Sequence, residues 1–389
     1  MGIKIDMDLT DFTDKDVQLM EMDMDKNLKN MEKFKTLAEK LKNNSILEEN
    51  EYEEIIEASS DERVRALFAG LAVEVREAHY GRDVYTRGLI EFTNICKNNC
   101  LYCGIRAGNN TVERYRLTEE EILSCAAEGY ELGFRTFVLQ GGEDDFFTPE
   151  AIGSLITKIK KMHPDCAVTL SVGEHEKEIY KYWYDCGADR YLLRHETATR
   201  EHYEALHPKT LSFEHRIQCL YDLKDIGYQV GAGFMVGSPG QTVKHLAHEL
   251  IFLKKFDPQM VGIGPFIPAE HTPFENEKQG TLEQTLLMLS LIRLTLPRVL
   301  LPATTALGTI HPRGRELGIQ AGANVVMPNL SPVAVRKKYQ LYDNKICTGE
   351  ESAQCRGCLE NRMESVGYKI VTARGDYKGI IPHTDNKTA

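Results

Sequence analysis

The 389-residue sequence has no run that approaches the ~20 consecutive apolar residues needed to span a bilayer. Its start, MGIKIDMDLTDFTDKD, is acidic and lacks the apolar core of a signal peptide, and Asp6 does not complete a myristoylation signal. Positively charged residues are also the minority, because the sequence has 47 Lys and Arg but 58 Asp and Glu, which gives a net charge of -11. That balance offers no general attraction to nucleic acid or anionic lipid. These absences predict a globular cytoplasmic protein with no membrane or nucleic-acid partner.

What the sequence does contain, between residues 85 and 334, is a regular alternation of short apolar runs and amphipathic stretches. The runs predict strands at 87–93, 136–140, 167–172, 190–195, 228–235, 260–266, 299–304 and 323–328. Eight even strand–helix units favour an α/β fold, a parallel (β/α)8 barrel of the TIM type, over the alternative of a doubly wound open sheet. The expected regions are a mobile acidic tail (1–25), an N-terminal helical segment (26–84), the barrel (85–334) and a C-terminal extension (335–389).

Six of the ten cysteines fall in two clusters, and clustering without an export signal indicates metal binding rather than disulfides. The first cluster, Cys96, Cys100 and Cys103 in NICKNNCLYCGIR, follows the first predicted strand. A structural zinc site takes four ligands, yet the next stretch, GIRAGNNTVERYRL, has no Cys or His. Three thiolates can hold three irons of a [4Fe–4S] cluster and leave the fourth iron open to an outside ligand. Since barrel enzymes place their chemistry at the C-terminal ends of the strands, an open cluster is favoured over a zinc site completed from afar.

Polar side chains occupy the predicted lumen of the barrel, because alternate residues of a strand face opposite sides. Two polar sets have inward parity: Arg190, Arg194 and Glu196 on one strand, and Thr169 and Ser171 on another. Tyr191 and Leu193 alternate with the first set and should therefore face the helices. Arginine presents a donor fork that matches carboxylates, so these sets predict a bound anion. Internal pairing of the arginines with Glu196 or Asp189 is the alternative.

Further candidates lie near the strand ends and on one helix. Thr304 and Thr305 lie at the end of the seventh strand. Tyr339, which follows the eighth strand, could close the barrel at either end. Arg216 and Lys224 are eight residues apart on one helical face. That face is either an anchor for a cofactor carboxylate or a solvated basic stripe.

The spacing C-x3-C-x2-C, with Tyr102 before the last cysteine, resembles the signature of the radical S-adenosylmethionine superfamily, and QGGE (140–143) matches its Gly-Gly-Glu element. LLRHETA, GFMVGSPGQT, VGIGPFIP, PATTALGTI and GANVVMPN resemble the HydE family of [FeFe]-hydrogenase maturases over about residues 85–360. The resemblance implies that S-adenosylmethionine binds the open iron of a [4Fe–4S] cluster and that its reductive cleavage gives a 5′-deoxyadenosyl radical. It also implies radical attack on the sulfur of a cysteine-bound Fe(CO)2(CN) complex, toward the diiron subsite of the H-cluster. The implied partners are this small iron-containing substrate, an electron donor and other hydrogenase maturation proteins.

The resemblance also assigns roles to single residues around a sealed, positively charged cavity. The cofactor set is Gly141, Gly142 and Glu143 at the methionyl amine, Glu196 at the ribose, Arg216 at the carboxylate and Met235 beside the adenosyl group. The substrate set is Thr169, Ser171, Arg190, Arg194, Thr304, Thr305 and Tyr339. Gly141 stands where Ser is equally expected, which removes a hydroxyl near the substrate.

The second cysteine set, Cys347, Cys355 and Cys358, resembles the auxiliary cluster site, often [2Fe–2S], of some members of that family. A zinc clip and three idle thiols are the alternatives. Two other functions stay open: a sister radical enzyme such as methylornithine synthase or a biotin-synthase-like enzyme, and a non-catalytic iron–sulfur scaffold. RHETA, TTALGT and the C-terminal cysteines disfavour the methylornithine branch, and a scaffold would have no use for a polar lumen.

Overall fold

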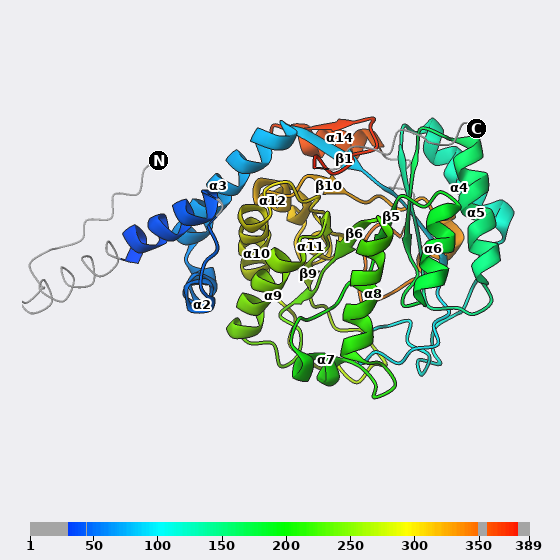
Figure 1. Ribbon diagram of the computed structural model, residues 1–389, viewed down its shortest axis with the longest axis horizontal. Helices are drawn as coiled ribbons and strands as arrows, with labels where there is room; N and C mark the ends of the chain where they lie inside the picture. The colour runs from blue at the N-terminus through cyan, green and yellow to red at the C-terminus, as the bar shows by residue number, and fades with distance from the viewer. Residues whose placement is uncertain (1–29, 44, 349–355, 380–389) are drawn as a thin grey trace, which may run out of the picture.

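The structure, a computed structural model, describes residues 30–43, 45–348 and 356–379 (Figure 1). The predicted acidic tail, 1–25, lies outside these residues. The central element is a parallel six-stranded sheet in which each strand pairs with the next barrel strand along the chain. Its strands are β2 (Gly88–Thr93), β3 (Thr136–Gly141), β4 (Ala167–Ser171), β5 (Arg190–Leu192), β6 (Gln229–Ala232) and β8 (Met260–Val261).

Single bridges carry the sheet round into a ring. Leu300 bridges to Met260 of β8, Pro302 bridges to Val325, and Asn329 bridges back to Leu89 of β2. The seventh and eighth predicted strands are therefore present mainly as bridged segments, with β10 (Val325–Val326) inside the eighth. Hydrogen-bonded pairs lead round all eight positions, so the predicted TIM-type barrel fold is confirmed.

Two small sheets flank the ring. β1 (Asp83–Thr86), just before β2, pairs in parallel with β10 on one side and with β11 (Lys369–Val371) on the other. β7 (Met235–Val236) pairs with β9 (Gly264–Pro265) beyond the ends of β6 and β8. The C-terminal region thus contributes a strand at the N-terminal end of the barrel, which the sequence patterns did not predict.

Helices follow the strands and cover the outside of the ring (Figure 1). They are α4 (Glu119–Glu131), α5 (Pro149–Met162), α6 (Lys177–Asp185), α7 (Arg200–Leu206), α8 (Phe213–Ile226), α9 (Val243–Phe256), α10 (Leu282–Thr295), α11 (Thr305–Ile310), α12 (Gly314–Gln320), α13 (Val333–Arg336) and, in the C-terminal region, α14 (Arg356–Glu364). α4 begins with a capping box, since the Thr118 hydroxyl accepts from Glu121 N (3.2 Å) and the Glu121 carboxylate accepts from Thr118 N (2.7 Å). None of the helices in the described part of the chain combines the length and apolarity needed to cross a membrane.

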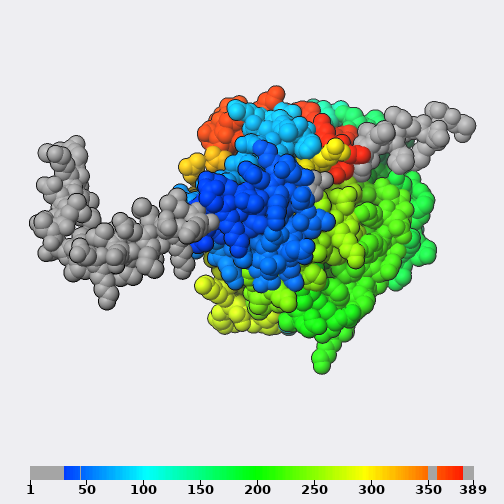
Figure 2. All heavy atoms as spheres, turned by 60° about the vertical axis from the view of Figure 1, so that its left-hand side comes forward, coloured from blue at the N-terminus to red at the C-terminus, as the bar shows by residue number. Residues whose placement is uncertain are grey.

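The N-terminal helices pack on the outside of the barrel rather than contributing to its lumen. A short 3-10 turn (Ala58–Ser60) joins α2 (Glu49–Glu57), which contacts α9, to the region of α3 (Glu62–Tyr80), which contacts α10. Figure 2 shows these helices, in blue, lying together on one face of the molecule.

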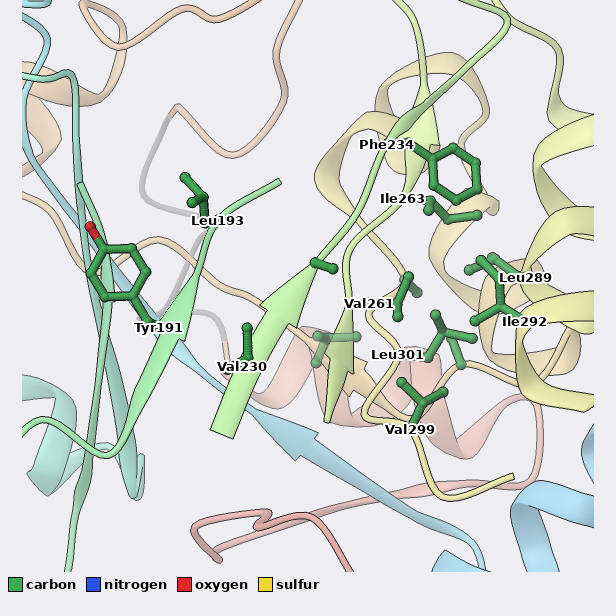
Figure 3. Packing of buried hydrophobic residues seen from close by; sticks show 14 of the residues in the cluster. Tyr191, Leu193, Val230, Phe234, Val261, Ile263, Leu289, Ile292, Val299 and Leu301 are labelled. Carbon is green, nitrogen blue, oxygen red and sulfur yellow. The ribbon is translucent and has the colours of Figure 1, made fainter. Parts of the chain in front are cut away.

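The main core lies between the ring and its helices. Tyr191 and Leu193, the predicted helix-facing residues of β5 and its extension, are buried there. In Figure 3, Leu289 and Ile292 of α10 pack toward Val261 and neighbouring strand residues. The period-two pattern therefore correctly separated the helix-facing side chains from those that face the lumen.

Candidate active site

A cavity of about 360 Å³ lies at the C-terminal ends of the barrel strands and extends into the lumen. Cys96, Cys100 and Cys103 line it from the loop after β2. That loop is joined to the end of β3, since Lys97 N donates to Glu143 O (2.9 Å). The three thiols therefore open into the space that the lumen residues share.

The three thiols of the loop are partly buried where they open into the cavity. Burial raises the pKa of all three, to about 12 for Cys103, and for Cys100 and Cys103 a neighbouring thiol raises it further. Three thiolates so close together are stable only beside cationic metal, which an iron–sulfur cluster supplies. Among the described residues no three His, Cys, Asp or Glu side chains converge on one point for a single ion. The thiolates of a cube bind three different irons, so their donor set fits an open [4Fe–4S] cluster.

Gly142 has a steric reason to be glycine. A Cβ atom there would lie 2.2 Å from Ile95 O and 2.7 Å from the Cβ of Cys96. A Cβ at Gly141 would meet side chains instead, the nearest being Thr93 Cγ2 at 2.8 Å. The second glycine of QGGE is therefore needed for close packing against the cluster loop.

Glu196 has a strained backbone at the rim of the cavity, with φ of 65°. A buried network behind it fixes this turn. Glu249 of α9 accepts from Ala198 N (2.6 Å) and from His195 Nε2 (2.7 Å), and both carboxylate and imidazole are fully buried. Since Gly233 N donates to His195 Nδ1 (3.3 Å), the imidazole proton is on Nε2. These hydrogen bonds hold the strained turn in place and keep Glu196 at the cavity.

The cationic residues of the cavity have carboxylate partners. Arg194 Nη2 donates to Glu196 Oε2 at 2.9 Å. Arg216 donates through Nε to Glu174 and through Nη1 to Arg194 O (2.7 Å). Lys345 Nζ lies 2.5 Å from Glu91 Oε1.

This pairing corrects the expected positively charged cavity, because among the described residues each of its three lysine and arginine side chains is matched by an acid. Free donors remain: Arg194 Nε and Thr304 Oγ1 are buried without a partner. Burial raises the pKa of Glu143, which also lines the cavity, although Arg216 acts to lower it.

Most of the sequence-predicted site residues meet in this cavity. Those that line it are Gly141, Gly142, Glu143, Ser171, Arg194, Glu196, Arg216, Met235, Thr304, Thr305 and Tyr339. Met235 packs with Leu206, Phe266 and Tyr102 in a small apolar cluster beside the cysteine loop. Tyr102 is fixed there by a contact of 3.2 Å between its hydroxyl and His207 Nε2.

Arg190 and Thr169 do not line the cavity, which corrects their predicted place. They pair across β4 and β5 one layer deeper in the lumen. Arg190 donates to Asp376 (2.7 Å) and to Thr136 (3.0 Å) at the N-terminal end of the barrel. The inward parity was right, but at ~3.3 Å per residue four residues put Arg190 about 13 Å below Arg194.

Lys224 is also outside the cavity. Its ammonium donates to the carbonyl oxygen of Phe256 at the end of α9, and it contacts the Phe256 ring. Eight residues of helix separate it from Arg216 by about 12 Å along the axis, so a shared face did not mean a shared site.

Sequence patterns missed three residues of the cavity wall, Glu91, Gln140 and Lys345. They also missed Glu174, which accepts from the cavity residue Arg216. Glu91 carried a usable signal, because it is a charged residue with inward parity inside the apolar run TRGLIEF. Lys345 lies in a loop and had none.

The second cysteine set is only partly described. Cys347 has φ of 65°, and its sulfur accepts from Arg315 Nη2 at 3.0 Å. Cys358 is exposed on α14, and Cys355 lies outside the described residues. An auxiliary cluster at this set stays a prediction.

Comparison with known proteins agrees with this geometry. The model of the radical SAM superfamily matches residues 90–253. The chain is 50% identical over 304 residues, 78% of this chain and 86% of the relative, to the [FeFe] hydrogenase maturase subunit HydE of Thermotoga maritima. It is 28% identical to the 3-methylornithine synthase of Methanosarcina barkeri, covering 90% of this chain and 98% of that one. The crystal structure of methylornithine synthase (PylB) matches with a TM-score of 0.75 at 26% identity, covering 86% of this chain and 97% of that chain. The chain belongs to the HydE family of radical SAM enzymes.

Proposed function

We propose that this protein matures [FeFe]-hydrogenase by adenosyl-radical chemistry on a small iron complex. The observation that carries the proposal is the shared cavity: the three thiols of the cysteine loop open into the same space as the unpaired donors of Arg194 and Thr304. The 50% identity to a HydE maturase supports the choice of pathway.

Cys96, Cys100 and Cys103 would hold the [4Fe–4S] cluster, which when bound supplies the electron that cleaves S-adenosylmethionine to a 5′-deoxyadenosyl radical. Around it, the chain positions the cofactor. Glu196 is held at the rim by its strained turn, and Arg216 has its guanidinium oriented by Glu174. The apolar cluster around Met235 would receive the adenosyl group. These residues orient the cofactor and keep water from the reacting atoms.

We propose that the substrate is the cysteine-bound Fe(CO)2(CN) complex, attacked at its sulfur. Arg194 Nε and Thr304 Oγ1 are donors without a protein partner, so they are free to bind an anionic or cyanide-bearing ligand. Ser171, Thr305 and Tyr339 line the same wall. The complex would arrive from other hydrogenase maturation proteins and an electron donor would reduce the cluster, both in the reducing cytoplasm.

The test is anaerobic incubation of the reconstituted protein with dithionite and S-adenosylmethionine, with and without the iron complex. We expect 5′-deoxyadenosine, more of it with the complex, and a reduced-cluster EPR signal that changes shape when S-adenosylmethionine is added. Replacing the three loop cysteines with Ala should abolish both. Formation of 3-methylornithine would instead assign the chain to the sister enzymes, and an EPR-active cluster that never yields 5′-deoxyadenosine would indicate a scaffold.

A matched pair of arginines tests the substrate site. Arg194→Ala should weaken binding of the iron complex by about 2–5 kcal/mol, the cost of removing one partner from a buried charged contact. Arg190→Ala, one layer deeper, should leave that affinity unchanged. Equal effects of the two substitutions would contradict the proposed place of the substrate.

A further inference from the structure

Residues 338–345, here named the strap, cross the mouth of the barrel after α13. On one side Leu341 O accepts from Gly104 N of the cysteine loop at 2.9 Å. On the other, Asp343 N donates to Pro268 O at 3.0 Å, in the loop after β9. The strap therefore joins the cysteine loop to the loop after β9, whose Ala269 lies beside Gly104.

A buried ion pair anchors the strap inside the barrel. Lys345 Nζ lies 2.5 Å from Glu91 Oε1, and the two side chains are 6% and 1% exposed. The second carboxylate oxygen of Glu91 accepts from Asn329 Nδ2 at 2.8 Å. Both members of the pair line the cavity. Glu91 thus joins the first strand, the eighth strand and the strap at one point of the wall.

The same lysine fixes a residue of the proposed substrate set. Lys345 Nζ donates to Tyr339 O at 2.8 Å and lies 4.8 Å from the centre of the Tyr339 ring. At its other end Tyr339 is held by Gln140, whose Nε2 is 3.3 Å from the hydroxyl. Loss of Lys345 would therefore remove the hydrogen bond to Tyr339 O. Among the described residues, the backbone of this cavity residue would then be held only through Tyr339 N, which donates to Arg336 O at 3.4 Å.

Charge gives the pair a second consequence. Without Lys345, Glu91 would be a buried carboxylate in the wall of a cavity that, on the proposed function, receives an anionic complex. Removing one partner of a buried pair leaves an uncompensated charge, whereas removing both does not. Lys345 therefore neutralises the charge of Glu91, and without it this part of the wall would be negative.

We propose that Lys345 is a positioning residue that determines specificity: its pair with Glu91 holds the strap and Tyr339 over the cavity and keeps the wall neutral for an anionic substrate. The inference deepens the proposed function and rests on it for the identity of the substrate. The order of the strap does not depend on that identity, so the two parts are tested separately.

The first test follows hydrogen exchange in the protein without added substrate. Lys345→Met should raise exchange of strap peptides and of the amides of Gly104 and Asp343 at least tenfold. The control is Lys338→Met, which removes another strap lysine whose partner, Glu113, is 73% exposed. Unchanged exchange in Lys345→Met would overturn the proposal.

The second test measures KM and kcat with the cysteine–Fe(CO)2(CN) complex. Lys345→Met should raise KM for the complex at least tenfold, and by a larger factor than it changes S-adenosylmethionine cleavage measured without the complex. Glu91→Gln combined with Lys345→Met should recover a large part of the lost KM, because the unpaired carboxylate is gone. A double variant no better than Lys345→Met would refute the charge argument.

The double variant also carries the test if Lys345→Met alone fails to fold. If the parent does not turn over the complex at all, the proposed function fails, while the exchange experiment still decides whether Lys345 holds the strap.

Discussion

Replacing Arg190 with Met should lower stability without affecting substrate binding. The Arg190 side chain is fully buried and donates to Asp376 Oδ1 (2.7 Å), Arg374 O (3.0 Å) and Thr136 Oγ1 (3.0 Å). Met has a similar length but no charge, so the carboxylate of Asp376 loses its most buried cationic partner. It keeps Arg374 Nε and Gln229 Nε2, each at 3.0 Å.

The size of the effect follows from these contacts. Breaking a buried ion pair by removing one partner costs about 3–5 kcal/mol, and the two remaining donors of Asp376 place the expectation near about 3 kcal/mol. At ~2.1 cal/mol/K per residue, the unfolding entropy of the chain is about 0.8 kcal/mol/K, so the midpoint of thermal unfolding should fall by about 4 °C.

The pH dependence has a definite sign. The pKa of Asp376 is held well below its usual range: burial acts to raise it, but Arg190, Gln229 and Arg374 lower it by more. A depressed carboxyl pKa stabilises the fold above the unfolded value of ~3.9, and that contribution is lost as the pH falls toward the folded value. The difference between parent and Arg190→Met should therefore be largest near neutral pH and shrink below about pH 4.

The assay is thermal unfolding of the cluster-free protein followed by circular dichroism, together with KM for the iron complex. Arg82→Met is the control, because the Arg82 side chain is 67% exposed beside Glu77, and its loss should cost less than about 0.5 kcal/mol. An unchanged unfolding midpoint with a tenfold higher KM would show that Arg190 binds the substrate, and it would refute the conclusion that Arg190 lies too deep in the barrel to do so.

Three further predictions concern the cavity and the second cysteine set. Glu249→Gln puts an amide NH2 against one of two buried donors, His195 Nε2 or Ala198 N. It should lower the free energy of unfolding by about 1–3 kcal/mol and weaken S-adenosylmethionine binding in equilibrium dialysis. A change in stability alone would contradict the role of Glu249 in positioning Glu196. Gly142→Ala should lower the iron content of the reconstituted protein far more than Gly141→Ala, because the Cβ at position 142 would clash with backbone. Equal iron content in both variants would show that the cysteine loop can shift to accommodate the Cβ. Replacing Cys347, Cys355 and Cys358 with Ser should remove any auxiliary-cluster iron and leave 5′-deoxyadenosine formation near parent level. Loss of hydrogenase maturation in this variant would show that the second cysteine set is needed.

The barrel was predictable because its signal is local and repeated. Each strand showed its own apolar run, and parity correctly directed Tyr191 and Leu193 to the helices and Ser171 and Arg194 to the lumen. The start of α4 was equally local, since a capping box needs only four consecutive residues.

Depth and partners were not predictable in the same way. Parity fixes the face of a strand but not the layer of the barrel, so Arg190 and Arg194 were assigned one role although they lie at different levels. The partner of Arg190 comes from Asp376, 186 residues later. The pairing of Lys345 with Glu91 spans 254 residues. Periodicity within one element carries no information about either contact.

The paired cations change how selectivity in this cavity is explained. A lumen with free arginines would attract any anion, and its buried charges would be costly until one arrived. Here Arg194 is paired with Glu196, Arg216 with Glu174 and Lys345 with Glu91, so these cations have counter-charges within the protein. A ligand must then be recognised by the donors left over, and these sit at fixed points in the wall. Selection by the position of a few donors, rather than by net charge, suits a site that must hold a cofactor and a small metal complex in one mutual orientation.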